Sequence, residues 1–152
     1  MKKLRIPIDQ LQYRIQGQYE LSVDGRILVS RVCGPWNFQA VKGYREAADE
    51  IIKTLSGAPW VVLAEISGEP LHTAESIDEL AKIICSHRGF GRCGTALVCE
   101  GESAIARIHQ LMLSRMYIMS GEPYYFAENE TDALAWLGQR LAEEMSSDKF
   151  KP

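Results

Sequence analysis

The stretch Trp60-Val61-Val62-Leu63-Ala64-Glu65-Ile66 decides the fold, because six of its seven residues are apolar. A nearly continuous apolar run of this length is typical of a β-strand at the centre of a parallel sheet, where helices cover both faces. The segment Ser56-Gly57-Ala58-Pro59 lies directly before it and is suited to ending a helix. Residues 60–66 therefore predict a central strand that is covered on both sides.

An antiparallel hairpin is expected upstream of this strand. Residues 19–23 alternate between apolar and polar side chains, and the alternation resumes over residues 27–32 after Asp24-Gly25. An Asp-Gly pair between two alternating runs is a strong hairpin signal, because both central residues of the favoured turn need positive φ. The first two strands of the domain are thus expected to pair antiparallel.

Helical periodicity follows each later strand. Asn37 is placed to cap a helix with apolar residues at three- and four-residue spacings, and Thr73 is placed to open a second helix. Further strands are predicted over residues 95–99 and 123–127, each followed by a helix. The order β-β-α-β-α-β-α-β-α predicts an α/β domain with a mixed sheet. An antiparallel N-terminal hairpin leads into parallel β-α units, and right-handed connections place helices over the sheet.

One domain is expected for a chain of 152 residues, which is long enough to bury a single core. Residues 1–18 are predicted to be an N-terminal extension, whose alternating apolar residues are typical of a strand that Pro7 confines to a sheet edge. Residues 19–145 would form the domain itself. Residues 146–152 are expected to be a flexible tail.

The composition argues against several classes of function. The chain has 46% hydrophobic and 24% charged residues and a formal charge of −3, so it lacks the positive field that nucleic-acid binding requires. Pro7, Asp9 and Gln10 interrupt the N-terminal region, which therefore does not fit a signal peptide. No window reaches the roughly 20 apolar residues of a transmembrane helix. We expect a cytoplasmic protein with no nucleic-acid partner.

The four cysteines, at positions 33, 85, 93 and 99, form no C-x-x-C pair. Metal and redox motifs usually rely on closer spacings. Cysteines inside apolar strand patterns behave as small hydrophobic residues, and reduced thiols fit the expected cytoplasmic location. No cofactor and no metal are predicted.

Two short signatures accompany this order of elements. They are Gly34-Pro35-Trp36-Asn37 at the end of the second hairpin strand and Ala133-Leu134-Ala135-Trp136-Leu137 in the last helix. With the element order, they resemble the STAS domain superfamily, and most of all its stand-alone SpoIIAA-like branch, over roughly residues 17–142. The resemblance implies a non-catalytic regulatory module that acts by protein–protein interaction. Some members are proposed to bind nucleotides or lipids.

The resemblance also implies a place to look for a phosphorylation switch. In the anti-sigma-antagonist members, a serine that follows an aspartate at the start of the helix after the central strand is phosphorylated. The corresponding pair here is Thr73-Ala74, so the switch serine is missing. Thr73 and Ser76 remain as candidate switch residues. Capping of the helix is the competing interpretation of Thr73, and neighbouring carboxylates would repel a phosphate.

The sequence contains fragments of catalytic motifs, but each lies in the wrong structural context. The pattern G-x-G-x-x-G over residues 89–94 precedes a predicted strand, whereas a dinucleotide site needs the strand before it. Ser103 opens a predicted helix without a matching base and acid. The histidines His72, His87 and His109 show no metal-ligand spacing and are expected at the surface. The protein is predicted not to be an enzyme.

Charge is distributed unevenly over the predicted sheet. The loops after the parallel strands carry only acidic charges, which are Glu69, Glu75, Glu100, Glu102, Glu128, Glu130 and Asp132. Carboxylates there stabilise helix N-termini, so an anionic ligand is disfavoured at this edge, and an acidic rim for a basic partner is the alternative. Arg88, Arg92 and Arg115 are expected at the opposite edge. Together with His87, the first two would form a small positive patch. We expect it to stay solvated, and attraction of an anion is the alternative.

The segment from Ile105 to Met119 is the predicted working surface, because it places large apolar residues on more than one side of a helix. The candidate contact residues are Ile108, Leu111, Met112, Arg115, Met116 and Met119. They would bind a protein partner or a second copy of the chain. The alternative is a lipid or other apolar small molecule, with Arg107 and Arg115 bringing the helix to an anionic membrane surface. Simple burial in the core is the third interpretation.

Overall fold

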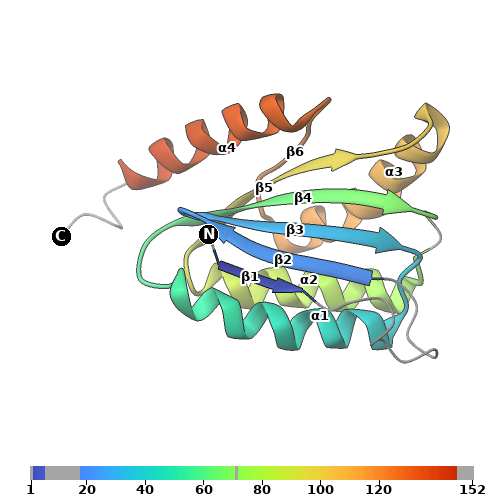
Figure 1. The fold of residues 1–152 in the computed structure, drawn as a ribbon, viewed down its shortest axis with the longest axis horizontal. Helices are drawn as coiled ribbons and strands as arrows, with labels where there is room; N and C mark the ends of the chain where they lie inside the picture. Colours follow the sequence, from blue (N-terminus) through green and yellow to red (C-terminus); the bar gives the residue numbers. More distant parts are fainter. Residues whose placement is uncertain (1, 6–17, 71, 147–152) are drawn as a thin grey trace.

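The computed structural model describes residues 2–5, 18–70 and 72–146 (Figure 1). The elements are β1 (Lys2–Arg5), β2 (Gln18–Asp24), β3 (Ile27–Gly34), α1 (Phe38–Ile51), the short 3-10 helix η2 (Ile52–Thr54), β4 (Trp60–Gly68), α2 (Ala74–Arg88), β5 (Arg92–Cys99), α3 (Ser103–Ser120), β6 (Tyr124–Phe126) and α4 (Glu130–Met145). Within the predicted N-terminal extension over residues 1–18, residues 2–5 form β1, which is the first strand in the order of the sheet. Residues 1 and 6–17 of that extension, and residues 147–152 of the tail predicted over 146–152, lie outside the described residues.

The six strands of the described residues form one mixed sheet in sequence order, from β1 to β6. β1 pairs antiparallel with β2, and β2 pairs antiparallel with β3. The pairs from β3 to β6 are all parallel. The predicted α/β fold class, an antiparallel hairpin followed by parallel β-α units, is therefore confirmed.

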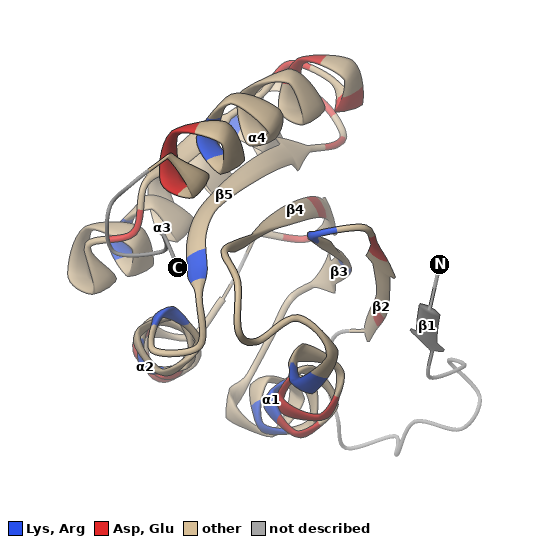
Figure 2. Ribbon diagram, turned by 90° about the vertical axis from the view of Figure 1, so that its left-hand side faces the viewer, with Lys and Arg blue, Asp and Glu red and all other residues tan. Residues whose placement is uncertain are grey.

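The helices lie on opposite faces of this sheet. Helices α1, α2 and α3 connect successive parallel strands that advance in one direction, and right-handed connections then keep all of them on one face. Their apolar residues share one core cluster with β2, β3 and β4. Helix α4 follows the last strand and is the one helix in the described part of the chain that packs against the other face (Figure 2). Strand β4 is consequently buried from Trp60 to Ala64, as its apolar run predicted.

Local sequence signals account for the ends of the helices. The side chains of Asn37, Thr73 and Asn129 accept hydrogen bonds from backbone amides three residues further on, at 3.0, 3.1 and 2.8 Å. These bonds satisfy amides that lack partners inside the helix. The predicted capping roles of Asn37 and Thr73 are therefore confirmed.

Two local predictions are wrong in detail. Asp24 pairs with Ile27, so the central turn residues are Gly25 and Arg26, and only Gly25 has a positive φ, of 61°. The hairpin register places the turn one residue later than the Asp-Gly pair suggested. Strand β5 begins at Arg92 and not at residue 95, because Arg92 turns into the interior and finds an ion-pair partner there.

Candidate functional site

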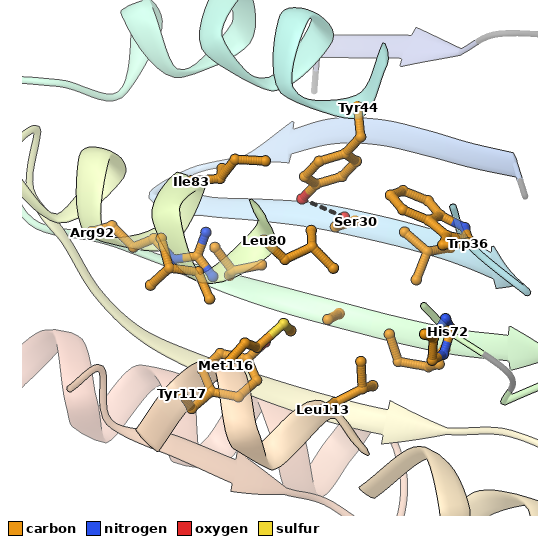
Figure 3. A pocket seen from close by; sticks show the side chains of 15 residues that line it. Ser30, Trp36, Tyr44, His72, Leu80, Ile83, Arg92, Leu113, Met116 and Tyr117 are labelled. Atoms are coloured by element: carbon orange, nitrogen blue, oxygen red, sulfur yellow. Dashed lines mark hydrogen bonds between the residues drawn. The ribbon is translucent and has the colours of Figure 1, made fainter. Parts of the chain in front are cut away.

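A partly open cavity of ≈ 60 Å³ lies between the sheet and the three helices α1, α2 and α3 (Figure 3). Its apolar lining comes from Val32, Val62, Ala64 and Ile66 on the sheet, from Leu80, Ile83 and Ile84 on α2, and from Leu113 and Met116 on α3. The remaining lining residues are aromatic or polar. Arg92 and His72 lie at opposite ends of the cavity (Figure 3).

A buried ion pair closes the Arg92 end. The Nε of Arg92 donates to Oε1 of Glu122 at 2.8 Å, and its Nη2 donates to Oγ1 of Thr95 at 2.9 Å. The Thr95 hydroxyl in turn donates to Oε2 of Glu122 at 2.7 Å. Burial acts to lower the pKa of the Arg92 guanidinium, but the charge of Glu122 raises it, and the net pKa is above the usual value. Three hydrogen bonds thus join Arg92, Thr95 and Glu122 into one buried network.

Tyrosine and serine hydroxyls line the middle of the cavity. The hydroxyls of Ser30 and Tyr44 are 2.9 Å apart and bond to each other. Burial raises the pKa of Tyr44 and of Tyr117, so both remain neutral phenols at ordinary pH. These groups are polar points in a mainly apolar space, an arrangement typical of small-molecule sites.

Two histidines meet at the other end. His72 Nε2 lies 3.2 Å from His109 Nδ1, and His109 Nε2 lies 3.0 Å from the carbonyl oxygen of Gly68. Burial, and then the neighbouring His109, lower the pKa of His72 to about 4. His109 is fully buried. The expectation of surface histidines is wrong here, because α3 carries His109 inward against the end of β4.

His87 is also buried, which corrects the same expectation. Its Nε2 donates to Oδ1 of Asp49 at 2.9 Å, while its Nδ1 has no hydrogen-bond partner within the described ranges. Burial lowers the pKa of His87 to about 4, although the Asp49 carboxylate acts in the opposite direction. A protonated ring would need to bury a second N–H without an acceptor, and this explains the low value.

The predicted positive patch around residues 87–92 is therefore wrong in two of its three members, since His87 and Arg92 both lie inside. Arg88 is exposed and donates to the carbonyl of Ser120 at 2.6 Å. It lines a surface pocket together with Arg92 and Arg140. Figure 2 shows basic segments on α2 and at the start of β5. Arg115 lies away from these, exposed on α3 and 3.8 Å from Asp78.

The predicted working surface on α3 is split by the structure. Met116 is buried and lines the cavity, and Met112 is half-buried. The outward side carries Ile108, Leu111, Arg115 and Met119, with exposed fractions of 43, 69, 66 and 51%. Ile118, at 71%, belongs to the same side, although the sequence did not single it out. Helix α3 thus covers a cavity with one face and presents an apolar stripe with the other.

The two switch candidates lie at the start of α2. Thr73 is exposed, and its hydroxyl oxygen caps the helix. Ser76 is fully buried, and its hydroxyl donates to the carbonyl of Thr73 at 2.7 Å. A kinase would reach Ser76 only after the first turn of α2 had opened.

The sequence did not reveal the buried partner of Arg92, the charged residue that lines the cavity. Glu122 is 2% exposed, yet it sits between glycine and proline in a segment that reads as a surface turn. Its partners are 27 and 30 residues away. No periodic signal connects residues at such separations. Among the residues described, no group of three or more His, Cys, Asp or Glu is arranged to hold a metal ion.

The arrangement of strands and helices is a SpoIIAA-like fold. A solved structure of an uncharacterized protein from the DUF3478 family of Shewanella loihica PV-4, which has a SpoIIAA-like fold, matches this chain with a TM-score of 0.56. The match covers 81% of this chain and 94% of that chain, at 14% sequence identity. No protein-family model matches the chain, and no curated protein matches it. The likeness therefore establishes the fold, as the sequence signatures predicted, and it does not extend to an activity.

Proposed function

We propose that this chain is a non-catalytic, STAS-like binding module whose cavity receives a small apolar ligand. The supporting observation is the cavity beneath α3, because close-packed interiors rarely leave a mainly apolar space that also contains a few polar groups. Of the two functions that the sequence predicts, ligand binding is the one that this geometry favours.

The size of the cavity limits the ligand. A cavity of ≈ 60 Å³ is smaller than the roughly 150 Å³ that accommodates benzene in an engineered protein core. A ligand larger than a few atoms must therefore displace a lining side chain. Met116 is the best candidate for such a movement, since an unbranched thioether adopts many shapes at low cost. A long acyl chain would require α3 itself to move away from the sheet.

Binding can be tested with benzene and xenon as probes, using amide chemical shifts as the readout. Leu113→Ala removes a buried side chain from the cavity wall, and Leu111→Ala removes an exposed one from the outer side of the same helix. We expect the Leu113 variant to bind benzene more tightly than the wild type, because the cavity becomes larger. The Leu111 variant should bind like the wild type.

Shift changes should be confined to the cavity side of the sheet, such as Ala64 and Ile66. Val61 and Leu63 face the α4 side of the same strand and serve as internal controls. Absence of saturable shifts for both probes in the wild type and in Leu113→Ala would exclude ligand binding in this cavity.

Docking of a second copy of the chain is a second candidate, and it corresponds to the protein-interaction role that the family resemblance implies. The observation that favours it is the exposed stripe on α3, where Ile108, Leu111 and Ile118 follow helical spacing. The stripe comprises five residues, Ile108, Leu111, Arg115, Ile118 and Met119, whereas a standard interface takes roughly 20–30 residues a side. We therefore expect weak association that depends on concentration.

Light scattering coupled to size-exclusion chromatography tests this second candidate. The wild type should approach the mass of a dimer as its concentration rises, whereas Leu111→Glu should remain a monomer. Ser114→Glu, on a less exposed side of the helix, is the matched charge control. A wild type that stays monomeric at millimolar concentration would exclude docking between copies.

The cellular setting belongs to the same proposal. None of the four cysteines, at positions 33, 85, 93 and 99, forms a disulfide, and this suits a reducing compartment such as the cytoplasm. No helix within the described ranges is long and apolar enough to cross a membrane. The exposed stripe, flanked by Arg107 and Arg115, is the surface on which we would expect any peripheral contact with anionic lipid.

A further inference from the structure

The paired histidines at one end of the cavity have a fixed pattern of proton donors. His109 Nε2 lies 3.0 Å from the carbonyl oxygen of Gly68, and a carbonyl only accepts hydrogen bonds. The proton of His109 is therefore on Nε2. In a neutral ring this leaves a lone pair on Nδ1, which lies 3.2 Å from His72 Nε2.

The same logic extends to His72. Its Nε2 must carry the proton that His109 Nδ1 accepts, so the lone pair of His72 is on Nδ1. That atom has no hydrogen-bond partner in residues 2–5, 18–70 and 72–146. His72 is half-buried and lines the cavity. The backbone carbonyl of Gly68 thus determines the tautomer of His109, and His109 in turn determines the tautomer of His72.

Close backbone packing holds the two rings in place. Gly68 ends β4 with a φ of +79°, a backbone conformation that glycine adopts readily. A Cβ on Gly34 would lie 2.8 Å from Cε1 of His72, so the glycine allows the ring to sit against the end of β3. The pKa of His72, lowered to about 4, keeps the ring neutral at physiological pH.

Polar groups in the middle and at the far end of the cavity have partners of their own. Ser30 and Tyr44 bond to each other, and Arg92 donates through Nε to Glu122 and through Nη2 to Thr95. At the His72 end, a ligand therefore meets a hydrogen-bond acceptor, Nδ1 of His72, and must place a donor there. A carboxylate, which has no proton to donate at neutral pH, is disfavoured, and Glu69 in the adjacent loop adds repulsion.

We propose that His72 Nδ1 is a hydrogen-bond acceptor for the ligand, so that the cavity selects small apolar molecules that carry one hydroxyl or N–H donor. His109 is a positioning residue that sets the tautomer of His72. This inference rests on the proposed function, because it names the chemistry of a ligand for the same cavity.

The tautomers can be tested without any ligand, by long-range ¹H–¹⁵N spectra of the imidazole rings in the uniformly labelled protein at pH 7. We expect both His72 and His109 to be protonated at Nε2 and unprotonated at Nδ1. His109→Phe should release His72 from this single tautomer. A proton on His72 Nδ1, or two protons on either ring, would overturn the proposal whether or not the cavity binds ligands.

Selectivity is tested with two isomers, 1-butanol and 1-methoxypropane, which have the same atoms but differ in the donor. If 1-butanol gains one net hydrogen bond to His72, it should bind about three to ten times more tightly than 1-methoxypropane. The His72 Nδ1 resonance should shift on addition of butanol alone. In His72→Leu, butanol should lose its advantage while both isomers still bind.

The outcomes separate the two proposals. Equal binding of the isomers to the wild type would overturn the role of His72 and leave ligand binding in place. Binding of neither isomer, together with no binding of benzene or xenon, would overturn both. Because the comparison of isomers uses the wild type, it does not depend on the folding of any variant.

Discussion

Arg92 and Glu122 form an ion pair at 2.8 Å, although their side chains are only 4 and 0% exposed. Strand β5 supplies the cation and the turn before β6 supplies the anion. Thr95 bridges them, so the pair is also hydrogen-bonded. Each charge is tolerated in the interior because of the other.

Removal of one partner should therefore be far more damaging than removal of both. Glu122→Gln leaves the Arg92 charge buried without a counter-charge and should lower the free energy of unfolding by about 3–5 kcal/mol. Arg92→Met combined with Glu122→Gln should recover a large part of that loss. Urea unfolding followed by tryptophan fluorescence measures both.

The exposed pair of Arg31 and Glu65, at 2.6 Å, is the control. Arg31→Met should change the free energy of unfolding by less than about 1 kcal/mol, since water already screens this pair. A double variant of Arg92 and Glu122 no more stable than Glu122→Gln alone would show that the two charges are not coupled.

Acid should destabilise the protein through His87. The folded state holds the pKa of this ring at about 4, whereas the ordinary value is 6.5. Between these two pH values the unfolded chain binds a proton that the folded chain does not, so the free energy of unfolding falls as the pH is lowered from 6.5 to 4. A fully buried ring with this difference contributes about 3 kcal/mol across that window.

The variant His87→Gln tests this contribution, because glutamine can still donate to Asp49 but does not titrate. The pH dependence of its unfolding free energy should be shallower than that of the wild type between pH 6.5 and 4. His72, with its pKa also lowered to about 4, leaves a residual slope of the same sign in the variant. If the unfolding free energies of the variant and the wild type changed with pH to the same extent, the pH dependence would not come from His87.

Gly34 is predicted to be sensitive to the smallest substitution. A Cβ there would meet His72 Cε1 at 2.8 Å and would overlap the carbonyl oxygen of Glu69. Gly34→Ala should therefore push the loop that carries His72 away from β3, with a loss of about 1–3 kcal/mol in the free energy of unfolding. The His72 ring resonances should change together with stability.

Gly138→Ala is the matched control on helix α4. A Cβ at Gly138 would meet no atom within 4 Å. An alanine in a helix is favoured over glycine, so this variant should gain about 0.5–1 kcal/mol. Equal changes in the free energy of unfolding for Gly34→Ala and Gly138→Ala would show that the close contacts of Gly34 with His72 and Glu69 do not limit stability.

The fold could be predicted from the sequence because it depends on local signals and on the periodicity of apolar residues. The apolar run of β4 and the caps at Asn37 and Thr73 are local, and the order of elements then fixes the faces of the helices through the handedness of the connections. The cavity groups depend on contacts between distant residues. His72 meets His109 across 37 positions, and Arg92 meets Glu122 across 30. Hydropathy and spacing carry no information about such contacts, and the histidines were accordingly placed at the surface.

The two sides of α3 could not be told apart from the sequence, for a related reason. Helical spacing identified the apolar residues, but it does not distinguish a face that covers a cavity from one that meets solvent. Leu111 and Leu113 differ by two positions and have exposed fractions of 69 and 3%. Only the placement of α3 against α2 and β5 decides which of them is inside.

Thr73 offers a test between a cap and a phosphorylation switch. Its hydroxyl accepts from the amide of Ser76 at 3.1 Å, and Glu75 adds negative charge to the first turn of α2. Thr73→Ala removes the cap and should lower the free energy of unfolding by about 1 kcal/mol.

Thr73→Asp keeps an acceptor at the same position and places a negative charge at the helix N-terminus, where the dipole favours it. If capping is the role of Thr73, the aspartate variant should match the wild type in stability and in its amide spectrum beyond the first turn of α2. Under a switch, the same substitution would imitate the phosphorylated state, and chemical shifts would change across α2 and at the His72 end of the cavity. Asn129→Asp on α4 is the control, because it changes another N-cap in the same way at a site outside the cavity.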